Sequence, residues 1–279
     1  RLLTRTQWQG WTPEGAVALS GPQGDFTLQA DVCVLALGGA SWPRLGSDGG
    51  WVRLLEAEGV SVSPFSPANA GVLCDWSPLF AERFAGQPLK PVRVYAGDLV
   101  SRGEVMVTRR GLEGGGIYAV MPRVREALVR EGRAVVSLDL KPDLALSSLA
   151  EKLDQLMRKA GGQSLSSVLK RQGLGSVAVG LLREGQVRLN GTPDLPRHAP
   201  SLATLIKAVP VPVTGLAGLE RAISSAGGVS WDSVSQTLEL TNRPGVWVCG
   251  EMLDWEAPTG GYLLQACLAS GHWVGQHAG

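Results

Sequence analysis

The sequence has few cysteines, four in 279 residues, and none of them forms a C-x-x-C pair. Cys33, Cys74, Cys249 and Cys267 are far apart, so a disulfide framework is not expected and a reducing, cytoplasmic compartment is favoured. Cys33 and Cys249 stand within apolar segments and are expected to be small buried hydrophobes. No His, Cys and carboxylate cluster has metal-site spacing, and no nucleophile elbow is present. We therefore expect neither a metal centre nor a Ser/His/Asp triad.

The sequence also lacks an excess of charge and a long apolar run. Its formal net charge is only +1, which gives no electrostatic reason to expect a nucleic-acid partner. No apolar run approaches the ~20 residues of a membrane span, so no membrane partner is expected. Hydrophobic residues make up 44% and charged residues 18%, which supports a sizeable core. We expect a small-molecule substrate, and the oligomeric state is open.

The most informative segment lies near the end of the chain. Residues 246–249 are apolar and predict a buried strand, which ends at Gly250 and Glu251. A loop then leads to Thr259-Gly260-Gly261 and an apolar helix. In α/β proteins a large cofactor is met at the carboxyl edge of the sheet and at a helix N-terminus. Glycine lets the backbone approach a flat ring, which a Cβ would obstruct.

Two further segments have the same character. Residues 34–37 are apolar and are followed by Gly38, Gly39 and an Ala-Ser-Trp-Pro run, and residues 222–229 contain a second glycine pair. In order and spacing, these three segments resemble those of the HI0933-like (BaiN-type) FAD-dependent oxidoreductases. The resemblance is strongest to the branch whose last motif reads Gly-Glu-Met-Leu-Asp-Trp and then Thr-Gly-Gly-Tyr. The segments bracket nearly the whole chain.

The resemblance and the residue pattern together predict an α/β fold. We expect a split Rossmann-like FAD-binding domain, of the two-dinucleotide-binding type, over residues 1–70 and 215–279. A β-barrel insertion is expected over 71–141 and 203–214, where prolines separate short strands, and a helical cap over 142–202.

Within these parts the pattern predicts particular elements. Residues 1–30 form a short meander, 31–37 a strand buried on both faces, and 51–58 a helix. Helical spacing over 147–184 includes a stop at Gly161-Gly162. The last helix is expected to pack through a stripe made of Leu264, Cys267, Leu268, Gly271 and Val274.

The resemblance assigns cofactor contacts to residues of both glycine motifs. These are Gly38, Gly39, Gly250, Glu251, Asp254, Thr259, Gly260, Gly261, Tyr262 and Leu263. The acid at Glu251 accepts hydrogen bonds from ribityl hydroxyls in such flavoproteins, although it also suits a capping carboxylate. Taken alone, Gly38-Gly39 is more typical of a plain tight turn, and Asp254 also suits a residue that fixes its loop. Many family members carry Asn at Leu263, so no Asn role is transferred.

The activity that the resemblance implies is hydride transfer at N5 of FAD. The hydride donor is NAD(P)H or an organic substrate, and a second acceptor reoxidises the ring. The proton-donor candidates are Tyr262, Arg109 and His198. Arg109 lies in a glycine-rich loop that resembles the flavin-facing loop of the family and equally suits a solvated loop. His198 stands between prolines, where a surface histidine is the more ordinary reading.

The family begins with a βαβ unit that carries G-x-G-x-x-G and a ribose-binding acid. No segment of this sequence matches that unit, and the chain begins at Arg1, so we expect a truncated piece of a longer enzyme. The alternative is a non-catalytic fragment that acts as an interaction module. A third possibility is an RNA-modifying flavoenzyme, against which the near-zero net charge counts.

Overall fold

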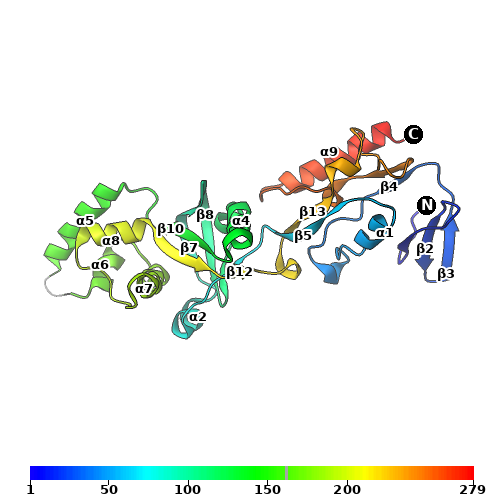
Figure 1. Cartoon of the computed structure of the whole chain (residues 1–279). Helices are drawn as coiled ribbons and strands as arrows, with labels where there is room; N and C mark the ends of the chain where they lie inside the picture. The colour runs from blue at the N-terminus through cyan, green and yellow to red at the C-terminus, as the bar shows by residue number, and fades with distance from the viewer. Residues whose placement is uncertain (161–162) are drawn as a thin grey trace. The chain divides into compact units, whose positions relative to one another are not determined.

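The computed structural model describes residues 1–160 and 163–279 (Figure 1). The chain divides into two compact units. Unit 1 consists of Arg1–Ala68 and Gly218–Gly279, and unit 2 is the continuous segment Asn69–Ala217. Unit 1 contains both glycine motifs, and unit 2 contains the proline-punctuated strands and the helical region.

Unit 1 begins with the expected antiparallel meander. Strands β1 (Gln7–Trp11), β2 (Val17–Gly21) and β3 (Gly24–Leu28) pair in the order β1-β2-β3. The chain then enters β4 (Cys33–Leu35), which pairs in parallel with β14 (Val246–Val248) from the other end of the sequence. Val34 lies opposite Trp247. Carboxyl ends of parallel strands meet at one edge of a sheet, so both glycine motifs begin at the same edge.

Strand β4 differs from the expected strand buried on both faces. Val34 is 45% exposed and Leu37 is 41% exposed, whereas β14 is buried along its length. In the described part of the chain no strand pairs with the second edge of β4. A parallel strand is buried when other elements cover both faces of its sheet, and the exposure of Val34 and Leu37 shows that β4 lacks such a cover among the described residues.

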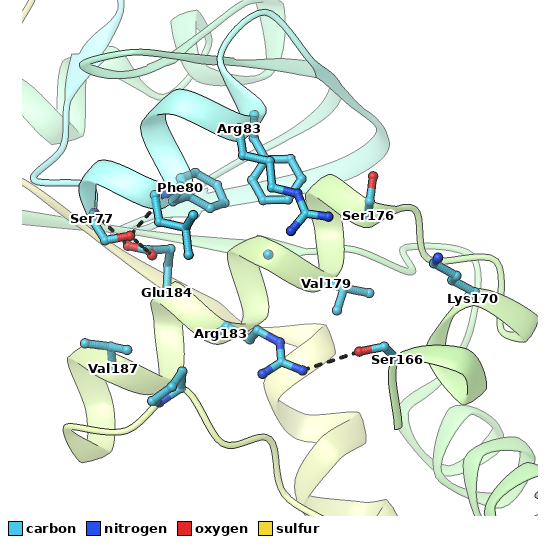
Figure 2. Close-up of a pocket in the computed structure, with 14 residues that line it drawn as sticks. Ser77, Phe80, Arg83, Ser166, Lys170, Ser176, Val179, Arg183, Glu184 and Val187 are labelled. Atoms are coloured by element: carbon cyan, nitrogen blue, oxygen red, sulfur yellow. Dashed lines mark hydrogen bonds between the residues drawn. The ribbon is translucent and has the colours of Figure 1, made fainter. Parts of the chain in front are cut away.

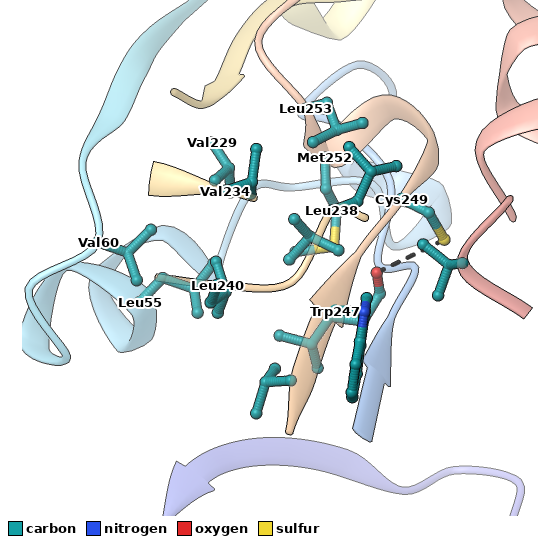
Figure 3. Packing of buried hydrophobic residues seen from close by; sticks show 14 of the residues in the cluster. Leu55, Val60, Val229, Val234, Leu238, Leu240, Trp247, Cys249, Met252 and Leu253 are labelled. Atoms are coloured by element: carbon teal, nitrogen blue, oxygen red, sulfur yellow. Dashed lines mark hydrogen bonds between the residues drawn. The ribbon is translucent and has the colours of Figure 1, made fainter. Parts of the chain in front are cut away.

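The core of unit 1 forms between these strands and a second pair. Strands β5 (Val62–Ala68) and β13 (Ser224–Val229) pair antiparallel, and the helix expected at 51–58 is α1 (Val52–Ala57). Figure 3 shows Leu55 of α1, Val229 of β13 and Trp247 of β14 in one apolar cluster. Three short 3₁₀ turns connect these elements within 218–252: η2 (Leu219–Arg221), η3 (Trp231–Ser233) and η4 (Gly250–Met252). A further 3₁₀ turn, η1 (Pro43–Leu45), follows the β4 motif.

The last helix, α9 (Tyr262–His277), is confirmed as a helix, but its expected packing stripe is wrong. Leu264 is 65% exposed and Leu268 is 62% exposed, and Val274 is the buried residue of the helix. The spacing of apolar residues predicts which face of a helix is apolar but not what covers that face. Within the described residues, α9 contacts mainly η4.

Unit 2 is built on one antiparallel sheet with the order β11-β10-β7-β8-β9-β6-β12. The expected β-barrel is not confirmed, because no sheet of the described residues forms a barrel. A barrel requires the terminal strands of the sheet to pair with one another. Here the order begins at β11, which pairs with β10, and ends at β12, which pairs with β6, and no pairing between β11 and β12 is found among the described residues. The strands are β6 (Val72–Leu73), β7 (Pro88–Ala96), β8 (Leu99–Thr108), β9 (Gly111–Glu113), β10 (Ala134–Asp139), β11 (Val209–Val213) and β12 (Gly215–Leu216).

Along the chain, the helices of unit 2 lie between these strands. They are α2 (Pro78–Phe84), α3 (Gly115–Tyr118), α4 (Met121–Glu131), α5 (Leu146–Lys159), α6 (Leu165–Arg171), α7 (Ser176–Asn190) and α8 (Ala199–Lys207). Helix α5 packs on α8 and α6, while α7 packs on α2 and β11. The helical region is therefore present, although its role as a cap is not confirmed. The stop expected at Gly161-Gly162 lies outside the described residues. No helix in the described ranges is long and apolar enough to cross a membrane.

Candidate functional site

The exits of β4 and β14 are joined by a buried hydrogen-bond network centred on Ser225. The Oγ of Ser225 accepts from the backbone N–H of Ala40 at 3.0 Å. The carboxylate Oε1 of Glu251 accepts from the backbone N–H of Ser225 at 2.9 Å and from its Oγ at 3.3 Å. Segments about 185 residues apart in the chain are thus held together at one edge of the sheet.

Gly39 lies at the centre of this network and has no room for a side chain. A Cβ at this position would lie 2.0 Å from Ser225 Oγ and 2.9 Å from Glu251 Cδ. The neighbouring Gly38 has a φ of +78°, and its carbonyl accepts from the indole N–H of Trp51 at 3.0 Å. The glycine pair is therefore required by close packing at one position and by a left-handed backbone at the other.

The exit of β14 is fixed in a similar way. Gly250 has a φ of +72°, and its N–H donates to Ser270 Oγ of α9 at 3.0 Å. Its carbonyl accepts from the indole N–H of Trp255 at 3.1 Å. In the Glu251 carboxylate, Oε1 accepts both bonds from Ser225, and Oε2 has no hydrogen-bond partner among the described residues. The observed contacts of Glu251 therefore fix β13 through Oε1.

The start of α9 presents unsatisfied backbone donors. Gly260 and Gly261 have φ values of +110° and +92°, and no side chain caps the helix within the described residues. The first intrahelical bond there runs from Gln265 N to Gly261 O, so the preceding N–H groups of the first turn have no intrahelical acceptor. Thr259 and Tyr262 are exposed. An open helix N-terminus of this kind favours a negatively charged group.

Asp254 and Leu263 complete the set of expected cofactor residues in unit 1. Asp254 Oδ2 accepts from Ser63 Oγ at 2.6 Å, and its backbone carbonyl accepts from the indole N–H of Trp231 at 2.7 Å. Its observed contacts therefore fix the loop after β14 against β5 and η3. Leu263 is partly exposed in the first turn of α9.

Arg109 and His198, two of the three proton-donor candidates, belong to unit 2, whereas Tyr262 belongs to unit 1. Arg109 is exposed beyond the end of β8. His198 is the N-cap residue of α8, and its Nδ1 lies 3.0 Å from Ser201 Oγ. The catalytic roles of Arg109 and His198 stay predictions.

A thiol also lies near the strand exits. Cys267 is close to Gly250, whose added Cβ would lie 3.7 Å from its sulfur. Burial and the nearby Glu251 carboxylate raise the pKa of the Cys267 thiol. The thiol is therefore uncharged near neutral pH and unsuited to act as a nucleophile. All four cysteines are free.

Ser225 is the residue that sequence reasoning missed. The segment 222–229 resembled the family, but its serines carried no motif that pointed to the β4 exit. Gly227 and Gly228 gave a signal, since Cβ atoms there would lie 2.5 Å from Pro64 O and 2.4 Å from Met252 O. Close packing requires glycine at both positions, because β13 lies directly against the backbone of Pro64 and of Met252.

The fold and the strand-exit network define a Rossmann-like domain of mixed α/β content, and comparison with known proteins gives the family. Residues 1–277 match the model of the HI0933-like protein Rossmann domain. The chain belongs to the HI0933-like family, as its three glycine-bearing segments predicted.

Two curated proteins are similar to most of the chain. The 3-dehydro-bile acid delta(4,6)-reductase of Clostridium scindens is 26% identical over 255 residues, which cover 89% of this chain and 62% of that protein. The ribosomal RNA dihydrouridine synthase of Escherichia coli is 26% identical over 251 residues, which cover 86% of this chain and 58% of that protein. The chain thus spans about three fifths of the length of these relatives.

A solved structure is similar at a lower level. It is 3-ketosteroid delta1-dehydrogenase from Sterolibacterium denitrificans in complex with 1,4-androstadiene-3,17-dione. The match has 14% sequence identity and a TM-score of 0.40, and it covers 98% of this chain and 59% of that chain. A TM-score at this level does not establish a shared arrangement of the whole chain.

Proposed function

We propose that the chain is the ring-binding part of a flavin-dependent oxidoreductase. Unit 1 would hold the isoalloxazine and ribityl portion of FAD at the strand exits of β4 and β14. The observation that carries this proposal is the contact between Gly39 and Glu251, which belong to the two glycine motifs. Membership of the HI0933-like family supports it.

The residues at the strand exits fit such a group. Gly38 is partly exposed and has a φ of +78°, so its backbone could face a flat ring, while the buried Gly39 lets the β4 exit pack against Ser225 and Glu251. Glu251 Oε2 is available to accept from a hydroxyl, because the ordered contacts of this carboxylate use Oε1. The first-turn N–H groups of α9 are oriented to stabilise negative charge on a reduced ring. When bound, FAD supplies the hydride chemistry, and the protein orients the ring and tunes its potential.

The finer assignment is hydride transfer between NAD(P)H or an organic substrate and a second acceptor. The relative from Clostridium scindens is named for reduction of a 3-dehydro-bile acid. We therefore propose a small organic molecule with an activated double bond as the acceptor. Tyr262, which stands exposed at the start of α9, is the proton-donor candidate within unit 1.

A second candidate function is modification of RNA, and the distribution of charge favours it. Residues 69–217 contain 20 Lys and Arg and 13 Asp and Glu, a formal net charge of +7. The remaining residues contain 6 and 12, a net charge of −6. A domain with this surplus attracts the phosphate backbone of a nucleic acid, and one relative is named as a ribosomal RNA dihydrouridine synthase.

The pyrophosphate and adenosine of FAD need a site of their own. We propose that a dinucleotide-binding βαβ unit outside residues 1–279 supplies it, since no G-x-G-x-x-G occurs in this sequence. Within unit 1, the second edge of β4 and its exposed Val34 are where a further parallel strand would pair.

The test is flavin binding by the purified chain and by the product extended with the upstream coding sequence. We expect the extended product to show the near-ultraviolet and visible bands of oxidised flavin. Glu251→Gln should weaken FAD retention about tenfold, because a hydrogen bond to a charged group contributes about 1.5–3 kcal/mol. Glu56→Gln, at an exposed position of α1, is the matched control. If both products remain colourless after FAD is added, the oxidoreductase assignment is wrong and the interaction-module alternative stands.

Once flavin is bound, the two candidate functions are separated by the acceptor that is reduced when NAD(P)H is supplied. Turnover with an enone as acceptor supports the small-molecule enzyme. Formation of dihydrouridine in an RNA transcript supports the RNA-modifying enzyme. This reaction should be lost in high salt, because salt weakens binding to the phosphate backbone.

A further inference from the structure

Unit 2 contains a cavity of about 560 Å³ that has no part in the proposed flavin site. It lies between α2, α6 and α7, so it is formed within one compact unit. Pockets for small ligands usually have volumes of about 300–1,000 Å³ and mostly apolar walls with a few converging polar groups. This cavity has both properties.

Apolar side chains form one wall of the cavity. Phe80 and Phe84 of α2 are 3% and 7% exposed, and Val179 of α7 is 7% exposed. The ring of Phe84 lies directly on the backbone of α7, because a Cβ at Gly180 would lie 2.5 Å from Phe84 Cε2. The two helices are therefore held at a fixed spacing, and the wall is preformed.

Cations line the rest of the cavity. Figure 2 shows the side chains of Arg83, Lys170 and Arg183 around Val179, each from a different helix. Within residues 1–160 and 163–279, Arg83 and Lys170 have no ion-pair partner, and Arg183 donates only to Ser166 Oγ at 3.3 Å. Arg83 also lies over the Phe84 ring, 5.4 Å from its centroid.

The one carboxylate in the lining, Glu184, offsets one of the three positive charges but forms no ion pair with these cations among the described residues. Glu184 accepts from the backbone N–H of Ser77 at 3.1 Å and from its Oγ, and Ser77 in turn caps α2 through Phe80 N. Glu184 is thus engaged at the start of α2. Three cations from three helices remain for an apolar cavity, a combination that suits a ligand with an apolar body and an anionic head.

We propose that this cavity binds an amphipathic carboxylate, with its apolar body against Phe80, Phe84 and Val179 and its carboxylate between Arg83, Lys170 and Arg183. Arginine binds a carboxylate through two parallel N–H donors, which fixes the head group. The proposal does not depend on the flavin site, because no residue of unit 1 lines the cavity.

The test is calorimetric titration of the full chain with dodecanoate, dodecanol and acetate. We expect dodecanoate to bind, dodecanol to bind at least tenfold more weakly, and acetate not to bind. The double variant Arg83→Gln/Arg183→Gln should weaken the binding of dodecanoate at least tenfold and leave the binding of dodecanol unchanged. Val179→Trp should fill the cavity and weaken the binding of both dodecanoate and dodecanol. Lys152→Gln/Lys159→Gln, at two exposed positions of α5, is the charge-matched control, and thermal melting checks that each variant folds.

Two kinds of outcome would overturn the proposal. One is a failure of carboxylate recognition: dodecanoate does not bind the unmodified chain, or it binds the double variant equally well. The other is binding of a single-stranded RNA oligonucleotide that depends on Arg83 and Arg183 while dodecanoate does not bind, which would assign these cations to a polyanion. Neither outcome depends on whether the chain binds FAD.

Discussion

Replacement of Gly39 by alanine tests the packing on which the candidate flavin site depends. The added Cβ would lie 2.0 Å from Ser225 Oγ, so the hydroxyl must move. This movement breaks the bond from Ala40 N, which is buried, and weakens the bond to Glu251. An unsatisfied buried N–H costs about 1–3 kcal/mol, and overpacking costs about 1–3 kcal/mol. We expect Gly39→Ala to destabilise unit 1 by about 2–6 kcal/mol.

Tryptophan fluorescence during urea denaturation measures this loss in unit 1 specifically. Eight of the nine tryptophans lie in unit 1, and Trp76 is the one in unit 2. The signal therefore follows one unit even when the two unfold in separate transitions. The same variant should lose FAD in the extended product, because Glu251 is displaced together with Ser225.

A double-mutant cycle gives the sharper version of this prediction. Ser225→Ala alone removes the bonds to Ala40 and Glu251, and it also removes the atom that the new Cβ would meet. Gly39→Ala/Ser225→Ala should therefore cost clearly less than the sum of the single variants. Additive costs, or a cost below about 1 kcal/mol for Gly39→Ala, would refute the reasoning that Ser225 holds the two motifs together.

Three other predictions concern stability. Asp139 is fully buried and lies 2.6 Å from Lys207 Nζ, so Lys207→Met should cost about 3–5 kcal/mol in thermal or chemical unfolding, and a cost near zero would contradict a buried ion pair. Burial raises the pKa of the Cys74 thiol to about 12, whereas its unfolded value is near 9.0. The free energy of unfolding should therefore fall as pH rises from about 9 to 12, and Cys74→Ala should show a smaller fall in the denaturation midpoint over this range. Gly275→Ala in α9 meets no neighbouring atom and should stabilise unit 1 by about 0.5–1 kcal/mol, whereas a lower melting temperature would show that this face is covered.

The strand exits were predictable because their physics is local. Apolar runs before Gly38 and Gly250 indicate strands, and parallel strands in an α/β fold bring their carboxyl ends to one edge. The pairing of Val34 with Trp247 follows from this rule, although 212 residues separate them in the sequence. A positive φ at Gly38 and Gly250 is likewise what a glycine after a buried strand leads one to expect.

The remaining features depend on what each segment packs against. Nothing in the sequence around Ser225 shows that its hydroxyl will meet the β4 exit, because the contact joins three separate segments. The apolar stripe of α9 was identified correctly as apolar, yet Leu264 and Leu268 are exposed because no described element covers them. The barrel was inferred from strand spacing, which does not determine whether the first and last strands of a sheet will pair.

Net charge shows the same dependence on organisation. A total of +1 argued against nucleic acid only as long as the chain was treated as one body. When the two units are counted separately, the formal net charge is +7 for residues 69–217 and −6 for the remaining residues. Fields at a surface decay over about 8–10 Å in physiological salt, so each unit presents its own charge to a partner. The charge argument against RNA therefore fails, and the choice between a small-molecule and an RNA substrate passes to the chemistry of the flavin site and the cations of unit 2.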